Sequence, residues 1–238
     1  MKKYLFILTF LLTGFLYGQE INTARFENVV KSLKIDRSKI KEEFCTEKKM
    51  PNAENSYIIV IPVIIEQFEE DYIFKLQNYI LITDEKGMIK NKYLDPAELT
   101  SDAVMLMGIG IDTGLYTISN GIRAFGVTVD FKGSSNPNPY SSGSISLYYP
   151  EGKTLRKVLD QFELNVSRGE WDTRCEGEFE DNHSYIIVDR TKSHHFTDLK
   201  IKTVSVKSIN TFENEECHEK ETSKTTYRTL KFRNGKYQ

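Results

Sequence analysis

The sequence predicts a mainly β protein, either an antiparallel β-sandwich or an irregular, propeller-like assembly of hairpins, with a short N-terminal helical segment. Two observations favour this fold class. After residue 56 the apolar residues fall in short runs rich in Ile, Val and Tyr, which are typical of strands. Clusters of turn-forming residues separate these runs, whereas helical spacing is scarce. The composition, with 39% hydrophobic and 28% charged residues, is that of an ordinary globular protein.

The first twenty residues have the order of a secretory signal peptide. A pair of lysines precedes an apolar run from Tyr4 to Tyr17, and small or polar residues follow. The run is too short to cross a bilayer, which needs roughly twenty apolar residues, and no second run of that length follows. We therefore expect residues 1–19 to be a signal peptide, and the mature protein to be soluble, without a transmembrane span, and periplasmic or secreted.

Residues 20–50 are expected to form a helical N-terminal segment that leads into a linker. The apolar positions follow the spacing of one helix face: Phe26, Val29, Val30 and Leu33. Asn22 or Thr23 is placed to cap a helix, and one short helix or two should lie between residues 23 and 44. Residues 46–56 are polar and contain a proline, so they predict the linker.

Residues 51–238 are predicted to form a single β-rich domain. Residues 57–65 read as a buried strand that Pro62 turns into an edge or bulged strand. A hairpin should join 72–83 to 88–94, with Gly87 supplying the positive φ of the turn. Residues 99–107 are the one place where a turn or two of helix is expected. Further strands are predicted at 116–118, 122–131, 144–149, 155–166, 185–188, 199–209 and 225–232.

Two of the hairpins resemble each other in sequence. Gly87 is followed eight residues later by Asp95, and Gly152 is followed eight residues later by Asp160. The intervals between such turns along the chain are irregular, which does not fit a repeat protein. We therefore interpret the similarity as shared hairpin chemistry.

Three cysteines remain after the leader, and two of them are expected to form a disulfide in an oxidising compartment. Cys175 and Cys217 lie in polar sequence contexts, where a free thiol gains little from burial. Cys45 follows the apolar end of a helical pattern instead. We predict the bond Cys175–Cys217 and leave the state of Cys45 open.

The sequence contains no strong signature of catalysis, and we predict no catalytic residue, metal site or cofactor. No Gly-x-Ser-x-Gly element is present, and the four histidines lack metal-ligand spacing. The formal net charge is −2, and about −4 without the lysines of the leader, so nucleic acid is not an expected partner, although a local basic patch could survive this averaging. An alternative is an envelope hydrolase that uses Asp172 with Glu170 or Glu178 from an acidic segment.

Four aromatic residues surround a loop at 133–143 that consists almost wholly of turn formers: Tyr140, Tyr148, Tyr149 and Trp171. Loops of this composition, with rigid aromatic anchors, are typical of recognition surfaces. We therefore predict that these residues bind an unknown protein or glycan ligand, with at least one of Tyr148 and Tyr149 in the core. Trp171 has two interpretations, since it can pack on the disulfide or lie exposed against a ligand.

The leader and the closing Leu-Lys-Phe-Arg-Asn-Gly-Lys-Tyr of this chain resemble exported proteins of Gram-negative bacteria. Residues 142–148, Ser-Gly-Ser-Ile-Ser-Leu-Tyr, resemble the Ser-Gly…Tyr element of periplasmic lysozyme inhibitors, and no residue role is carried over from so short a match. The sequence thus favours an exported β-rich binding protein of a Gram-negative envelope. An inhibitor or immunity-type partner that inserts the 133–143 loop into a secreted enzyme, such as a lysozyme, is the main alternative.

Overall fold

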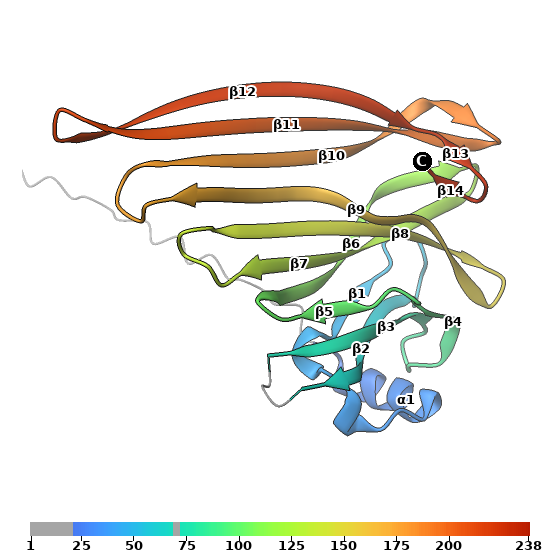
Figure 1. Ribbon diagram of the computed structural model, residues 1–238. Helices are drawn as coiled ribbons and strands as arrows, with labels where there is room; N and C mark the ends of the chain where they lie inside the picture. Colours follow the sequence, from blue (N-terminus) through green and yellow to red (C-terminus); the bar gives the residue numbers. More distant parts are fainter. Residues whose placement is uncertain (1–20, 69–71) are drawn as a thin grey trace, which may run out of the picture.

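The computed structural model describes residues 21–68 and 72–238, and the predicted signal peptide at 1–19 lies outside the described residues. In this part the chain is mainly β with one short N-terminal helix, as predicted (Figure 1). The helical elements are α1 (Thr23–Leu33) and the 3₁₀ turns η1 (Arg37–Lys39) and η2 (Glu42–Phe44). The strands are β1 (Thr46–Lys49), β2 (Tyr57–Gln67), β3 (Phe74–Thr83), β4 (Ile89–Leu94), β5 (Leu99–Ser101), β6 (Val104–Ser119), β7 (Ile122–Gly133), β8 (Tyr140–Glu151), β9 (Thr154–Trp171), β10 (Gly177–Ser193), β11 (Phe196–Glu213), β12 (Glu216–Leu230), β13 (Phe232–Arg233) and β14 (Lys236–Tyr237).

The N-terminal helix forms as its sequence pattern predicts. Asn22 is the cap, since its side-chain oxygen accepts a hydrogen bond from the Arg25 N–H at 3.0 Å. Phe26, Val29 and Val30 are buried along one face. The second helix that the pattern allowed is replaced by η1 and η2, each three residues long.

The small sheet has the order β1-β2-β3-β4, with β5 also paired to β3. The prediction of a linker at 46–56 is wrong at its start, because residues 46–49 form β1. This polar strand is held by a tertiary contact that its sequence does not reveal: Glu47 is buried and forms an ion pair with Arg25 of α1, whose guanidinium also stacks on the Tyr57 ring. The turns at 50–55 complete the connection to β2.

The expectation for Pro62 is confirmed only in part, because β2 carries a bulge but lies between β1 and β3 and is not an edge strand. Strand β1 pairs with β2 only as far as Val60, and beyond it the Lys41 N–H donates to the Pro62 carbonyl at 3.2 Å. A bulge follows between Ile64 and Glu66. The predicted β3–β4 hairpin also forms, with Gly87 in its turn at a φ of 85°.

The helix expected at 99–107 is wrong. Residues 99–101 form β5, and residues from Val104 onward begin β6. The Met, Leu and Ala residues there favour helix locally, but pairing of Leu99 with Leu76 and of Leu106 with Phe131 overrides that preference. The predicted strands from 116–118 to 199–209 lie within β6–β11, whereas the one predicted at 225–232 runs past the end of β12 at Leu230 into β13.

The large sheet is an antiparallel meander with the order β12-β11-β10-β9-β8-β7-β6. In Figure 1 these long strands lie one above another, and β10–β12 extend well beyond the small sheet and α1. At the opposite end the sheet curls, and this brings β6 close to β10 and β11. There the Ser119 hydroxyl at the end of β6 donates to the His195 carbonyl in the β10–β11 turn at 3.0 Å. The β13–β14 hairpin covers this end, where the Tyr237 hydroxyl donates to the Thr197 carbonyl at 2.7 Å.

Three apolar clusters hold the layers together. The first joins the small sheet to β6–β8 and includes Val60, Leu76, Ile109, Val127 and Tyr148. The second lies inside the curl of the large sheet and includes Ile118, Leu147, Phe162, Ile201 and Phe232. The third packs α1 on the small sheet and includes Phe26, Val29, Ile59 and Leu81. The two sheets therefore pack face to face instead of radiating as propeller blades.

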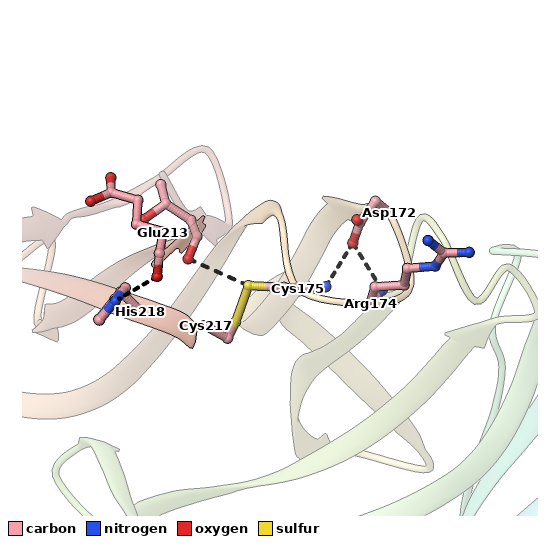
Figure 2. The surroundings of a disulfide bond; sticks show 7 residues. Asp172, Arg174, Cys175, Glu213, Cys217 and His218 are labelled. Atoms are coloured by element: carbon pink, nitrogen blue, oxygen red, sulfur yellow. Dashed lines mark hydrogen bonds between the residues drawn. A yellow bond between two sulfur atoms is a disulfide. The ribbon is translucent and has the colours of Figure 1, made fainter. Parts of the chain in front are cut away.

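The predicted disulfide Cys175–Cys217 is confirmed, with the two Cα atoms 5.8 Å apart (Figure 2). It joins the turn between β9 and β10 to the start of β12, across the end of β11. The Sγ of Cys175 also lies 3.4 Å from the Thr211 carbonyl. Cys45 is free and half-buried, and burial raises the pKa of its thiol to about 12, with the nearby carboxylates of Glu42 and Glu43 adding to the shift.

Candidate functional site

An open groove of about 760 Å³ crosses strands β8–β12 next to the core inside the curl. Its lining is mostly polar and includes Tyr140, Phe162, Arg168, Asn182, Thr203 and Arg228. Concave sites beside the core of a curled sheet are common places for ligands. The groove is therefore the principal candidate site.

The strand register explains why distant residues meet in the groove. Thr203 of β11 pairs with Ser184 of β10 on one side and with Thr226 of β12 on the other. Directly paired residues of antiparallel strands project from the same face. Two residues along, Ile201 and its neighbours on this face enter the apolar cluster inside the curl. The polar groove is thus the continuation of that apolar face, which we call the groove face.

The floor of the groove combines hydroxyl groups with an aromatic ring. The hydroxyls of Ser184 and Thr203 are hydrogen-bonded at 2.9 Å. The Arg228 guanidinium lies over the Phe162 ring, 5.2 Å from its centroid. These groups present donors and acceptors beside a flat apolar surface.

One wall of the groove carries a paired arginine. Arg168 donates to the Glu180 carboxylate at 2.6 Å, and the Asn182 amide donates to the same carboxylate at 3.0 Å. The Asn182 hydrogen bond and the Arg168 guanidinium hold the pKa of Glu180 below its usual value. Glu180 is therefore an ionised acceptor and not a proton donor at neutral pH.

Tyr140 links the groove to the predicted loop. It is the first residue of β8, is half-buried, and lines both the groove and a second hollow of about 410 Å³ that includes Ser134, Asn136 and Pro139. The irregular part of the loop is shorter than predicted, at residues 134–139, because β7 continues to Gly133 and β8 already begins at Tyr140. Of the four predicted aromatics, Tyr140 alone lines the groove.

Trp171 fastens this loop to the end of β9. Its indole N–H donates to the Asn136 carbonyl at 2.7 Å, and its backbone N–H donates to the Pro137 carbonyl at 3.0 Å. The indole also lies beside the Phe179 ring, with centroids 6.1 Å apart. Trp171 therefore holds the loop and packs beside Phe179.

Two glycines make room for this aromatic pair. A Cβ at Gly177 would lie 2.3 Å from the Cβ of Trp171, and a Cβ at Gly169 would lie 2.4 Å from the Phe179 ring. Each glycine lies directly across the sheet from the aromatic residue it accommodates. No sequence pattern indicates that these two positions must be small.

Tyr148 and Tyr149 are both core residues, with exposures of 1% and 7%. They project from opposite faces of β8, and each face packs on a different apolar cluster. The 142–148 segment that resembles lysozyme inhibitors is therefore part of a central strand. The structure separates these two tyrosines from Tyr140 and Trp171, which lie at the other end of β8 and β9.

The two similar hairpins meet at a buried charge cluster that the sequence analysis missed. Lys157 donates to Asp95 at 2.8 Å and to Asp160 at 2.6 Å, so one ammonium group joins the equivalent aspartates of both hairpins. The Tyr148 hydroxyl donates to the other oxygen of Asp95 at 2.5 Å. The sequence feature that could have indicated this cluster is the eight-residue spacing that Gly87–Asp95 and Gly152–Asp160 share.

Comparison of the chain with known proteins finds no matching family model, no matching curated protein and no matching solved structure. The assignment of function therefore rests on the geometry alone.

The geometry gives the hydrolase alternative no support. Asp172 caps the β9–β10 turn, since one carboxylate oxygen accepts the N–H groups of Arg174 and Cys175 at 2.8 Å each (Figure 2). These hydrogen bonds hold the pKa of Asp172 below its usual value. Glu178 is paired with Lys207 at 2.7 Å. Glu178 also lies directly across from Glu170, and both line a separate hollow of about 260 Å³. An exposed turn carboxylate with a lowered pKa is not suited to act as a general acid.

Among residues 21–68 and 72–238, no three His, Cys, Asp or Glu side chains lie close enough to hold a metal ion. No helix in the same part of the chain is both long and apolar enough to cross a membrane.

Proposed function

We propose that this chain is an exported binding protein of a Gram-negative envelope, and that it holds a glycan in the groove across β8–β12. The observation that carries the proposal is the lining of the groove. Amide, hydroxyl and guanidinium groups of Asn182, Thr203 and Arg168 alternate there with the planar rings of Tyr140 and Phe162. Sugars offer both hydroxyl groups and flat C–H faces, and this combination satisfies both.

The leader and the disulfide support export in this proposal. Residues 1–19 have the charge and hydropathy order of a signal peptide. Disulfides such as Cys175–Cys217 persist in oxidising compartments. An envelope location would also give the groove access to surface glycans.

The test is a glycan array probed with the mature protein and two variants of neighbouring residues. Thr203→Trp fills the groove, whereas Val204→Trp adds the same ring on the opposite face of β11. We expect the unmodified protein and Val204→Trp to retain the same glycans, and Thr203→Trp to retain none. A protein that retains no glycan, or a Thr203→Trp variant with normal retention, contradicts the proposal.

An inhibitor that presents the 134–139 loop to a secreted enzyme is a second candidate. The observation that favours it is that N–H groups of Gly169 and Trp171 donate three hydrogen bonds to carbonyl groups of this exposed loop. A loop held in one conformation loses less entropy when it binds a partner. Deletion of residues 134–138 should then abolish capture of the enzyme while groove ligands are unaffected. Capture that survives the deletion contradicts this candidate.

A further inference from the structure

Strand β12 forms one edge of the large sheet, and between Glu219 and Arg228 it sorts its charges by face. Glu216, at the start of the strand, projects from the same face as the cations of this stretch. Lys220, Lys224 and Arg228 recur every four residues, so all three project from one face of the strand. That face is the groove face, because Arg228 lines the groove. Glu219 and Glu221 occupy alternate positions and project from the opposite face.

The three cations of this row have no carboxylate partner within 4.0 Å, among the residues that the structure describes. The other cations of the groove face differ, since Arg168 is paired with Glu180 and Lys207 with Glu178. All three members of the row are exposed. Their positive charge is therefore available to a ligand.

The row has a spacing that suits an extended ligand. Four residues of a strand span roughly 13 Å, so the row extends roughly 27 Å along β12 from Arg228, which is the member of the row that lines the groove. The hydroxyl and amide groups of Thr203, Ser184 and Asn182 lie beside it on the neighbouring strands. A chain that carries repeated negative charges and many hydroxyl groups meets both sets of residues. The groove is also lined by the carboxylates of Asp160 and Glu163, which suit hydroxyl groups of the ligand, so the ligand's negative charges are matched by the row on β12.

Edge-strand lysines also have a general role, which is to prevent sheets from joining edge to edge. That role requires charge on the edge but no preference for one face. Between residues 219 and 228 of β12 the lysines and the arginine lie on the groove face, while Glu219 and Glu221 lie on the other. The segregation of charge, together with the groove beside it, points to a ligand.

We propose that the groove and the row Lys220, Lys224 and Arg228 bind an anionic polysaccharide whose carboxylate groups pair with these cations. The inference rests on the proposed function that the groove holds a glycan, and adds the charge of that glycan. A nucleic acid is also a polyanion, but the short row, bordered by glutamates, offers no broad basic surface for a phosphate backbone.

The test measures binding of three polymers to the mature protein: polygalacturonate, which is carboxylated, dextran, which is neutral, and a single-stranded DNA oligonucleotide. Two double variants are compared. Lys220→Gln/Lys224→Gln removes two charges from the groove face. Lys200→Gln/Lys202→Gln removes two charges from the opposite face, on the neighbouring strand β11, and is the matched control. Thermal unfolding checks that both variants fold.

We expect polygalacturonate to bind, and to bind more weakly as salt increases. The groove-face variant should lose at least about fivefold in affinity, because each exposed ion pair contributes modestly, and the control should change less than twofold. Equal losses in both variants would mean non-specific attraction and overturn the inference. Binding of dextran alone, undisturbed by either variant, would overturn it and leave the proposed function standing. Binding of DNA alone, or of no polymer, would overturn the inference, and the glycan array then decides the proposed function.

Discussion

At the scale of single residues, the buried cluster around Lys157 joins the two sheets. Asp95 follows β4 of the small sheet, whereas Lys157 and Tyr148 belong to the large sheet. Asp95 accepts hydrogen bonds from both of them, at 2.8 Å from Lys157 and 2.5 Å from Tyr148, and its side chain is 9% exposed. A buried carboxylate with two such donors fixes how the layers are placed against each other.

Replacement of Asp95 by Asn should lower the free energy of unfolding by about 3 kcal/mol, since it removes one partner of a buried ion pair. Asp160→Asn is the control, because Asp160 contacts the same ammonium but its side chain is 56% exposed. The control should cost less than about 1 kcal/mol. Urea unfolding measures both, and equal effects would show that Asp95 does not join the sheets.

The same cluster predicts a loss of stability in alkali. Burial lowers the pKa of Lys157, but hydrogen bonds from its ammonium to Asp160 and Asp95 outweigh this effect and raise it. Burial and the Asp95 carboxylate also raise the pKa of Tyr148 far above its usual value. Both groups hold their protons more tightly in the folded state, so their stabilisation is complete below about pH 10 and is lost as the pH rises further.

Urea unfolding between pH 8 and pH 11 tests this linkage. The free energy of unfolding should fall above about pH 10, and the fall should be shallower in Tyr148→Phe, which has no hydroxyl to ionise. The slopes of the free energy of unfolding against pH are compared, because the constant loss of stability that the substitution itself causes does not affect a slope. An equal slope in both proteins contradicts the assignment to this cluster.

At the scale of elements, the far ends of β10–β12 depend on the disulfide. Strand β12 is exposed from Glu216 to Thr229, and the groove face is polar there, so little apolar burial holds the strands together. The bond Cys175–Cys217 closes a loop between residues 42 positions apart. It ties the turn after β9 to the hairpin that starts β12.

Replacement of both Cys175 and Cys217 by Ala should lower the free energy of unfolding by up to about 4 kcal/mol on the chain-entropy model. Hydrogen exchange should rise at residues 208–220, near the bond, while residues 199–203, which adjoin the apolar core, keep their protection. Cys45→Ala, which removes the free thiol, should leave residues 208–220 unchanged. Uniform loss of protection along β11 would contradict a local role.

The Trp171 anchor gives a second prediction for an element, the 134–139 loop. Gly177→Ala would place a Cβ 2.3 Å from that of Trp171, so the indole must shift and its hydrogen bond to Asn136 weakens. We expect a red shift of the fluorescence of this single tryptophan and a cost of about 1–3 kcal/mol. Gly108→Ala is the control, since nothing lies within 4 Å of its added Cβ. An unshifted fluorescence spectrum in Gly177→Ala would contradict the role of Trp171 in holding the loop.

At the scale of the whole molecule, the sequence predicts what local patterns determine. The spacing of Phe26, Val29 and Val30 predicts α1, and turn residues predict the β3–β4 hairpin. The polar contexts of Cys175 and Cys217 predict the disulfide. All three depend on short stretches of chain.

The wrong predictions concern residues whose structure is determined by contacts with partners distant in sequence. Strand β1 exists because Glu47 meets Arg25, and β5 because Leu99 pairs with Leu76. The groove was missed for the same reason, since the register of five strands brings together residues between 140 and 228. The binding prediction includes Tyr148 because it lies close in sequence to the turn-rich 133–143 loop, whereas its face of β8 is covered by the small sheet.

The central claim is that the groove face of β8–β12 is the binding surface of this molecule. Backbone amide chemical shifts of the isotopically labelled mature protein, recorded during a titration with oligogalacturonate, test it most directly. The account predicts that the changes concentrate at residues 164–168, 182–184, 203–207 and 220–228. Changes confined to the small sheet and α1, or spread evenly over the molecule, would contradict it.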